Sequence, residues 1–321
     1  MRHTNRTMSS KPTIHKNPLA LLQFFSSNGR GFAFGLMAAI LYGLVPTFTL
    51  PIRVTAGVDN PDAMSDISIL FYRFFGASII LGLIMVFQRK SFRITRGEAV
   101  TLTYLAFLSD GAALFLLAGY EYMSSGIATT IHFMYPVVTA IIMMLFYHES
   151  RRPATILAVV MAVAGVGVLS MPSGDSTVGM RGVVLELISA VCFALYLIRL
   201  NRSRVADMDN LKLVFYVCFI GGIIFGGEAF RQEQFQLVTT TPQATYLILL
   251  AIICTVATNL GLAASAKLIG STTTAVLGAL EPLTAVVLGN IFFNEAVTWN
   301  VLTGIVLIIP AVIIVIFTRS R

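Results

Sequence analysis

Two apolar stretches decide how this chain folds: SGIATTIHFMYPVVTAIIMMLFYHE at residues 125–149 and STTTAVLGALEPLTAVVLGNIFFNE at residues 271–295. Each has a proline near its middle and a glutamate at its end. The two prolines are 146 positions apart, and so are the two glutamates. About 20 apolar residues are enough for a helix to cross a bilayer. The matching spacing predicts two membrane-spanning helices in corresponding places of an internal repeat.

The composition of the whole chain indicates a membrane protein. Of 321 residues, 56% are hydrophobic and only 12% are charged, and the mean hydropathy is +0.83. A soluble domain carries roughly 25% charged residues, so a soluble fold of this composition would expose large apolar patches. Ten spans would use about two-thirds of the length, because each needs about 20 residues. That leaves no room for a separate soluble catalytic domain.

Apolar runs recur along the entire sequence. The predicted spans are Gly31–Pro51, Ile67–Phe87, Ala99–Tyr120, Gly126–Tyr147, Pro153–Met171, Gly182–Leu200, Leu213–Gly227, Ala244–Ala266, Thr272–Phe293 and Val297–Phe317. Continuous runs of this length are typical of helices and not of alternating barrel strands. We therefore predict an all-α integral membrane protein with ten transmembrane helices. Its predicted parts are a basic tail (1–30), a first five-helix repeat (31–171), an extracytoplasmic linker (172–181) and a second five-helix repeat (182–318).

The distribution of basic residues predicts the orientation, since cytoplasmic loops are enriched in Lys and Arg. With the N-terminus inside, the cytoplasmic side carries the basic tail together with Arg89, Lys90, Arg93, Arg96, Arg151, Arg152, Arg199, Arg202, Arg204, Lys212, Lys267, Arg319 and Arg321. The opposite side keeps Arg53, Arg181 and Arg231, and it carries the acidic residues Asp59, Asp62 and Asp66. Both termini are predicted to be cytoplasmic, so the net charge of +7 reflects topology and does not indicate nucleic-acid binding.

An odd number of helices in each repeat means that the second copy crosses the membrane upside down. The loop charges agree, because Glu121 falls outside whereas its counterpart Lys267 falls inside. Inverted repeats are typical of alternating-access carriers, whose site lies near the midplane between the repeats.

Four pieces of sequence carry a family resemblance: Tyr72-Arg73-Phe74, Pro136 with Glu149, Gly165-Val-Gly167-Val, and Glu281-Pro282 with Glu295. With these pieces the chain resembles the EamA-like family of the drug/metabolite transporter superfamily, over residues 31 to 318. The resemblance implies a secondary transporter of a small metabolite or drug-like solute in a bacterial cell membrane, and an exporter. It does not imply one substrate. One departure is Pro310, which interrupts the tenth span where the first repeat has Ala164.

The two proline-containing spans predict the position of the site. His132, Tyr135, Pro136 and Thr139 share one helical face, and the corresponding face of the ninth span presents Glu281 beside Pro282. Tyr135 and Glu281 lie roughly 13 Å from their helix starts, near the middle of the hydrocarbon core. Each proline removes an N–H and weakens its helix, which is tolerated only against protein or a wet cavity. We predict a cavity lined by these helices.

Charged residues inside the spans are the second signal, because a charge at mid-bilayer costs about 3 kcal/mol or more. The residues concerned are Arg73, Asp110, Glu186 and Glu281. Glu281 is predicted to bind substrate or to exchange protons. Arg73 and Asp110 are predicted to form a buried ion pair, and Glu186 is predicted to pack.

The candidate substrate or coupling residues are Glu281, Tyr135, His132, Asp110, Arg73 and Thr139, and the predicted helix kinks are at Pro136 and Pro282. For His132 a packing role is the better expectation, although its place beside Tyr135 keeps it among the candidates. Glu149 and Glu295 close their spans at the membrane edge and are predicted to be structural. The three cysteines, Cys192, Cys218 and Cys254, fall in apolar runs and form no disulfide or zinc pattern.

Other classes of function fit the sequence less well. It has no nucleotide-binding loop, zinc-protease motif or nucleophile elbow. An intramembrane lipid-modifying enzyme would have to use His132, Asp110 and Glu281 together, and a channel does not explain an inverted repeat. We therefore expect no enzyme activity, cofactor, metal or nucleic acid. The expected partners are a small-molecule substrate, with or without coupled protons, and the lipid bilayer.

Overall fold

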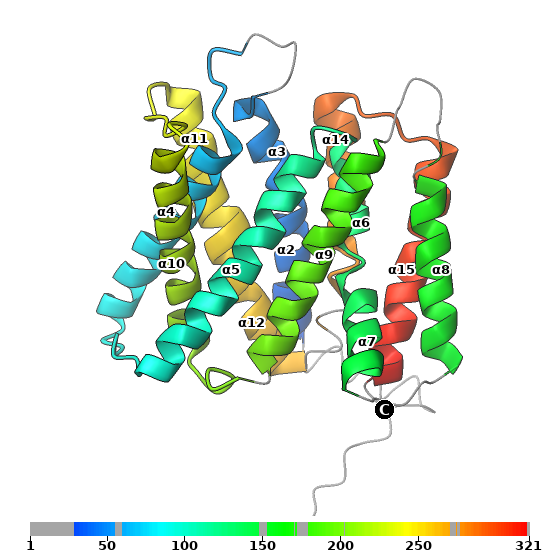
Figure 1. The fold of residues 1–321 in the computed structure, drawn as a ribbon, viewed down its shortest axis with the longest axis horizontal. Helices are drawn as coiled ribbons and strands as arrows, with labels where there is room; N and C mark the ends of the chain where they lie inside the picture. The colour runs from blue at the N-terminus through cyan, green and yellow to red at the C-terminus, as the bar shows by residue number, and fades with distance from the viewer. Residues whose placement is uncertain are drawn as a thin grey trace, which may run out of the picture.

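Helices make up almost the whole of the described chain (Figure 1). The computed structural model describes residues 29–54, 60–147, 153–169, 171, 179–201, 203–269, 274 and 277–319. Within these residues, the only β-type pairing is an isolated bridge between Arg53 and Met64. Most of the predicted tail and linker, the His148-Glu149 pair and the Ser271-Thr272 pair lie outside the described residues.

The first half of the chain forms helices that run back and forth through one bundle. They are α2 (Gly29–Gly43), α3 (Val45–Thr49), the short 3-10 helix η1 (Leu50–Ile52), α4 (Asp66–Phe87), α5 (Arg96–Gly119), α6 (Ser125–His132), α7 (Tyr135–Phe146) and α8 (Pro153–Leu169). The predicted first span is not one straight helix, because α2 and the α3–η1 segment meet at a bend of 42°. Pro46 lies at the start of α3, a position where a proline is tolerated. A helix cannot continue regularly from α2 through Pro46, because proline lacks an N–H and its ring clashes with the preceding turn.

The second half follows the same alternating course. Its helices are α9 (Met180–Asn201), α10 (Asn210–Arg231), α11 (Thr241–Leu249), the π-helical segment η2 (Leu250–Ala257), α12 (Thr258–Ile269), α14 (Leu280–Phe293) and α15 (Trp299–Arg319). Helix α10 is longer than the predicted span Leu213–Gly227. The helix continues through the polar flanks at both ends, where Asp209 caps its N-terminus.

Six helical segments of the described chain are long and apolar enough to cross a membrane. The bent α2–α3–η1 pair would add a seventh, and α8, α14 and α15 are shorter apolar helices. Large apolar side chains such as Val100, Phe146 and Val306 stay exposed on the outside of the bundle, as expected where lipid is the solvent. The predicted multi-pass helical membrane protein is confirmed. The count of ten spans remains a prediction.

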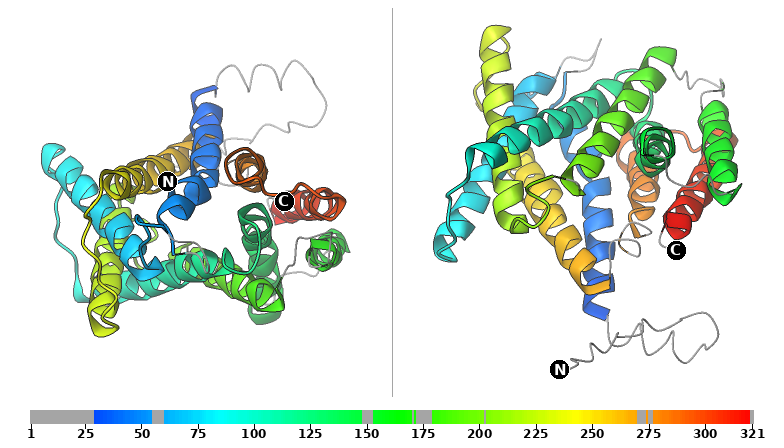
Figure 2. Two further views of the ribbon diagram at one scale, coloured as in Figure 1. Left: turned by 90° about the horizontal axis from the view of Figure 1, so that it is seen from above. Right: turned by 60° about the horizontal axis from the view of Figure 1, so that its bottom comes forward.

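The closest packing joins helices of different halves. The main pairs are α4 with α10, α8 with α15, α5 with α9, α2 with α12, and α6 with α14. Seen from above, the α4–α10 and α8–α15 pairs lie at opposite ends of the bundle, with the other pairs between them (Figure 2). If the halves are exchanged according to the predicted repeat, α2–α12 becomes α9–α5, and α4–α10 and α8–α15 map onto themselves. Helix α14 corresponds to α7, so the α6–α14 contact maps onto itself only as a contact between the fourth and ninth predicted spans.

Candidate functional site

The fourth predicted span is broken in its middle. Helix α6 ends at His132, Phe133 and Met134 form a turn, and α7 begins at Tyr135. Pro136 lies in the first turn of α7, where its missing N–H leaves no bond unmade. The turn lies directly before Pro136, the position of the predicted kink.

The ninth predicted span has the same break. Gly278 and Ala279 form a turn, α14 begins at Leu280, and Pro282 lies in its first turn. The Glu281 N–H donates to the Gly278 carbonyl at 3.0 Å. Both breaks therefore lie directly before the residues singled out from the sequence, Tyr135 and Glu281.

Glu281 is buried between the halves. Its side chain is 7% exposed, and Oε1 has no hydrogen-bond partner among the described residues. Helix α2 approaches α14 closely here, because a Cβ added to Gly43 would lie 2.9 Å from the Glu281 carbonyl oxygen. Tyr42, the neighbour of that glycine, interacts electrostatically with Glu281, and so does Tyr135. The Glu281 carboxyl thus lies within electrostatic range of two tyrosines, near the point where α2 closely approaches α14.

Tyr135 and His132 belong to an aromatic group. The Tyr135 ring meets the Phe193 ring edge-on at 4.7 Å between centroids, and the His132 and Tyr135 rings are 6.0 Å apart. His132 Nδ1 lies 2.8 Å from Ser189 Oγ, which donates to the Ala112 carbonyl at 2.6 Å. Because that serine proton is engaged, we assign Nδ1 of His132 as the donor. His132 is therefore a hydrogen-bonded packing residue behind Tyr135.

Thr139 makes a local bond, from Oγ1 to the Tyr135 carbonyl at 2.7 Å. It lies on the face shared with Tyr135, as predicted, but its donor is used within its own helix. The hydroxyl therefore supports the start of α7.

The predicted ion pair between Arg73 and Asp110 is wrong. Arg73 Nε donates to Thr255 Oγ1 at 3.1 Å, and its guanidinium lies over the Phe74 ring at 5.5 Å. Both carboxylate oxygens of Asp110 are without a hydrogen-bond partner among the described residues. Asp110 faces Gly221 of α10, whose added Cβ would lie 2.5 Å from Oδ1. Similar depth does not make the two residues partners, because α4 and α5 are rotated so that their side chains point to different neighbours.

The structure thus brings some predicted residues together and separates others. Arg73 and Glu281 both interact with Tyr42, so Arg73, Tyr42, Tyr135 and Glu281 form one central group. Asp110 faces Gly221 of α10, and the fully buried Glu186 packs against Gly119. No three metal-binding side chains of the described part converge on one point.

Sequence analysis missed two partners in this region. Thr255 fixes Arg73, and Ser189 fixes His132. Both are polar residues inside apolar runs, and neither lies at a spacing that singles it out. Their roles arise from contacts between helices far apart in the chain.

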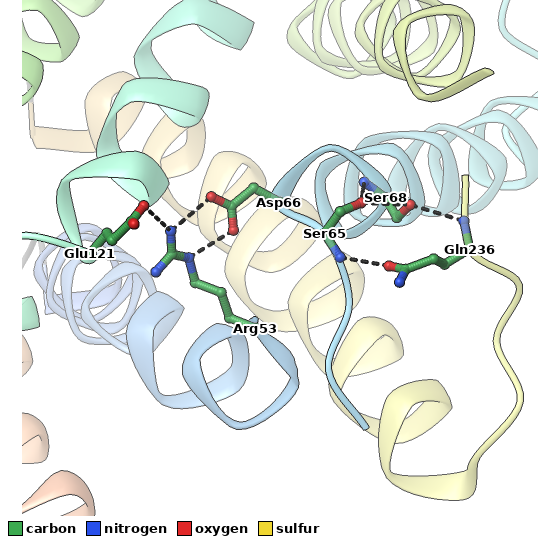
Figure 3. A network of polar contacts seen from close by, with 6 residues as sticks. All are labelled: Arg53, Ser65, Asp66, Ser68, Glu121 and Gln236. Atoms are coloured by element: carbon green, nitrogen blue, oxygen red, sulfur yellow. Dashed lines mark hydrogen bonds and ion pairs between the residues drawn. The ribbon is translucent and has the colours of Figure 1, made fainter. Parts of the chain in front are cut away.

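A polar network ties helix ends together at the top of the bundle in Figure 1. Arg53, at the end of η1, donates to Asp66 at the start of α4 and lies 3.8 Å from Glu121 after α5 (Figure 3). The neighbouring Ser65 N–H donates to Gln236 Oε1 at 2.6 Å, and the Gln236 N–H donates to Ser68 Oγ at 3.1 Å (Figure 3). The loop between α3 and α4 is therefore joined to the loop between α10 and α11.

Comparison with known proteins matches these features to one family. The model of the EamA-like transporter family fits the chain twice, over residues 29–171 and 180–317. The chain belongs to the EamA-like transporter family. The resemblance predicted from the sequence is confirmed, and this family is part of the drug/metabolite transporter superfamily.

A relative and a solved structure are consistent with this assignment. The uncharacterized transporter YvbV of Bacillus subtilis (strain 168) is 27% identical over 206 residues, which are 63% of this chain. The match spans 66% of YvbV, slightly less than two-thirds of its length. A protein crystal structure matches the EamA-like chain with a TM-score of 0.63 and 14% identity, over 91% of this chain and 98% of that one. At that identity the likeness concerns the fold alone.

Proposed function

We propose that this EamA-like protein is a secondary, alternating-access carrier that exports a small metabolite or drug-like solute. The observation that carries the proposal is the position of Glu281. Its buried carboxyl lies on α14, which packs against α2 and α6, and it interacts electrostatically with Tyr42 and Tyr135. An ionisable group at such a junction is expected to bind substrate or to relay protons.

The proposed architecture is ten transmembrane helices in two inverted five-helix repeats, 31–171 and 182–318, joined by a linker at 172–181. The packing supports it, because the pattern of neighbouring helices is unchanged when the halves are exchanged. The matching breaks before Pro136 and Pro282 support it as well. In an alternating-access cycle, the two halves would rock against each other around the central group.

The proposed location is a bacterial cell membrane with both termini in the cytoplasm. The basic residues of the loops support this orientation. The loop after α4 and the loop before α10 meet at one end of the bundle, where Lys90 pairs with Asp209 at 2.7 Å. The basic residues Arg89, Arg93 and Arg204 lie in these same two loops. That end would be cytoplasmic, and the Arg53 network would be at the outer end.

Counterflow in proteoliposomes tests the proposal. Purified protein would be screened with radiolabelled amino acids, hexoses, nucleosides and polyamines, each against its own unlabelled excess. A carrier gives transient accumulation of at least one compound above protein-free liposomes, and Glu281→Gln abolishes it. Accumulation that is absent for every compound, or unchanged in Glu281→Gln, would contradict the proposed site. Dissipation of the label gradient without counterflow would indicate a channel.

A further inference from the structure

Glu295 joins the end of one broken-helix span to the beginning of the other. It follows α14, and its Oε1 and Oε2 accept the N–H groups of Ser125 at 2.7 Å and Gly126 at 3.2 Å. These are the first two residues of α6. The residue before α6, Ser124, makes no side-chain cap, so Glu295 takes the place that a local capping residue usually holds.

The surroundings of this contact are shaped to hold it. A Cβ on Gly289 would overlap the Glu295 carboxylate, and a Cβ on Gly126 would lie 2.6 Å from Val286 Cγ2. The left-handed backbone of Asn294 turns the chain back after α14, and the Glu295 N–H donates to the Gly289 carbonyl at 3.1 Å. The carboxylate is therefore delivered to the start of α6 by a defined turn, against a close helix–helix contact.

The contact crosses the path that an alternating-access carrier has to open. Helix α6 runs from Ser125 towards Tyr135, and α14 runs from Glu281 towards Glu295, so the start of α6 and the end of α14 lie on the same side of the central group. Moving these ends apart separates Glu295 from both N–H groups. Glu295 is partly exposed, so water can solvate its carboxylate. The N–H groups of Ser125 and Gly126 are buried in the closed contact and would meet water once the helix ends separate, so the contact is one that can be broken and remade.

We infer that Glu295 acts as an outer clasp: its carboxylate holds the start of α6 against the end of α14 whenever the transport site does not face outward. Glu295 is thus a positioning residue. This rests on the proposed carrier function and orientation. A carboxylate suits the role because its two oxygens accept two N–H groups at a helix N-terminus, where negative charge is favoured. Glutamine at 295 keeps the shape but replaces one acceptor with a donor amide.

The clasp is tested by accessibility, with no need for a known substrate. Ala128, one helical turn below the contact, is fully buried. Ala128→Cys would be labelled with a membrane-impermeant maleimide in right-side-out and inside-out vesicles, and the signal of the same protein without the introduced cysteine would be subtracted. Glu295→Gln should raise outside labelling on the order of tenfold, as expected for loss of a charge-assisted hydrogen bond. Inside labelling should not rise.

Glu228→Gln is the matched control. Glu228 has the same charge at the same end of the bundle, but among the described residues its carboxylate bonds to Arg231 and Gln232 of its own helix region. Glu228→Gln should therefore leave the outside labelling of the Ala128→Cys protein unchanged. Where Glu295→Gln does not fold, Glu295→Asp keeps the charge with a shorter reach and should give a smaller rise.

Unchanged labelling in a folded Glu295 variant, or an equal rise in Glu228→Gln, would overturn the clasp and leave the carrier proposal untouched. Failure of counterflow with increased labelling in Glu295→Gln would overturn the carrier proposal alone. The two proposals therefore fail separately.

Discussion

Arg53 and Asp66 form a two-bond ion pair that fixes the end of η1 to the start of α4. Arg53 Nε and Nη2 donate to the two carboxylate oxygens at 2.7 Å and 2.9 Å, and the side chains are 5% and 22% exposed. Paired, planar contacts of this kind are the strongest form of ion pair in proteins. The backbone supports it, since the Met64 N–H donates to the Ile52 carbonyl at 2.7 Å.

Arg53→Gln is expected to lower thermal stability substantially, because breaking a buried pair costs about 3–5 kcal/mol. Asp66→Asn should do the same, and the double variant should lose clearly less than the sum. The measurement is a double-mutant cycle from melting curves in detergent. The exposed pair Arg231–Glu228 is the control, with an expected coupling of at most about 1 kcal/mol. Additive losses at Arg53 and Asp66 would show that the pair does not couple.

How far the sequence predicts this molecule depends on whether a signal is local. Pro136 and Pro282 lack an N–H wherever they lie, so the helix breaks before Tyr135 and Glu281 could be predicted. The depth of Arg73 and Asp110 could also be estimated by counting along their helices. Their partners could not, because these depend on how each helix is rotated about its axis, which only tertiary packing sets.

Two further features could be predicted only in part. The bend before Pro46 follows from a proline in an apolar run, but its angle depends on the packing of α2 against α12 and α14. Glu295 was recognised only as a membrane-edge residue with a structural role. Its partners are Ser125 and Gly126, about half the chain away, and no periodicity links them.

Asp110→Asn should leave stability unchanged or raise it. Both carboxylate oxygens lack a partner among the described residues, so no bond is lost and a buried ionisable group is removed. Combined with Arg73→Gln, the effects should add to within about 0.5 kcal/mol. The test is thermal unfolding of the two single variants and the double variant. If the double variant recovers the stability lost in Arg73→Gln, Arg73 and Asp110 are paired after all.

Asp209 should make the contact between the α4–α5 and α9–α10 loops sensitive to acid. Partial burial alone would raise the pKa of Asp209, but the Lys90 ammonium and the backbone N–H groups of Lys212 and Leu211 outweigh it and hold the pKa below its usual value. A lowered folded-state pKa stabilises the protein above the unfolded value of about 3.9. This stabilisation is lost as the pH falls through the lower, folded-state pKa.

Asp209→Asn keeps the helix cap and removes the ion pair. The variant should be less stable than the parent at pH 7 by at most about 1 kcal/mol, since the pair is partly exposed. The melting temperatures of Asp209→Asn and of the parent protein, measured from pH 7 to pH 3, should converge at the acid end. A constant difference across that range would show that the carboxylate charge of Asp209 does not contribute.

The loops should label from opposite sides of the membrane. Single cysteines replacing Lys90 and Glu233 lie at opposite ends of the bundle, and we expect the first to react from the cytoplasm and the second from outside. The measurement is impermeant-maleimide labelling of intact cells, with permeabilised cells as the control for reactivity. Labelling of both cysteines from one side would overturn the proposed orientation and the inverted repeat.

Glu281→Gln should abolish or uncouple transport while the protein stays folded. The substitution preserves the shape of a side chain that already lacks a partner at Oε1, so melting and solubility should change little. If Glu281 exchanges protons, flux driven by a pH gradient is lost while some exchange persists. If it binds a cationic substrate directly, binding is lost as well, and the two roles separate in an equilibrium binding assay with the compound that shows counterflow.

Glu186→Gln is the matched control for that experiment. Glu186 is also fully buried, and neither of its oxygens has a partner among the described residues, but it packs against Gly119 of α5. The general cost of a buried carboxyl is thus present in both residues, whereas the electrostatic interaction with Tyr42 and Tyr135 is that of Glu281. Loss of transport in Glu281→Gln with near-normal transport in Glu186→Gln would assign the effect to the central group. Wild-type flux, pH dependence and affinity in Glu281→Gln would make this carboxyl a structural group instead.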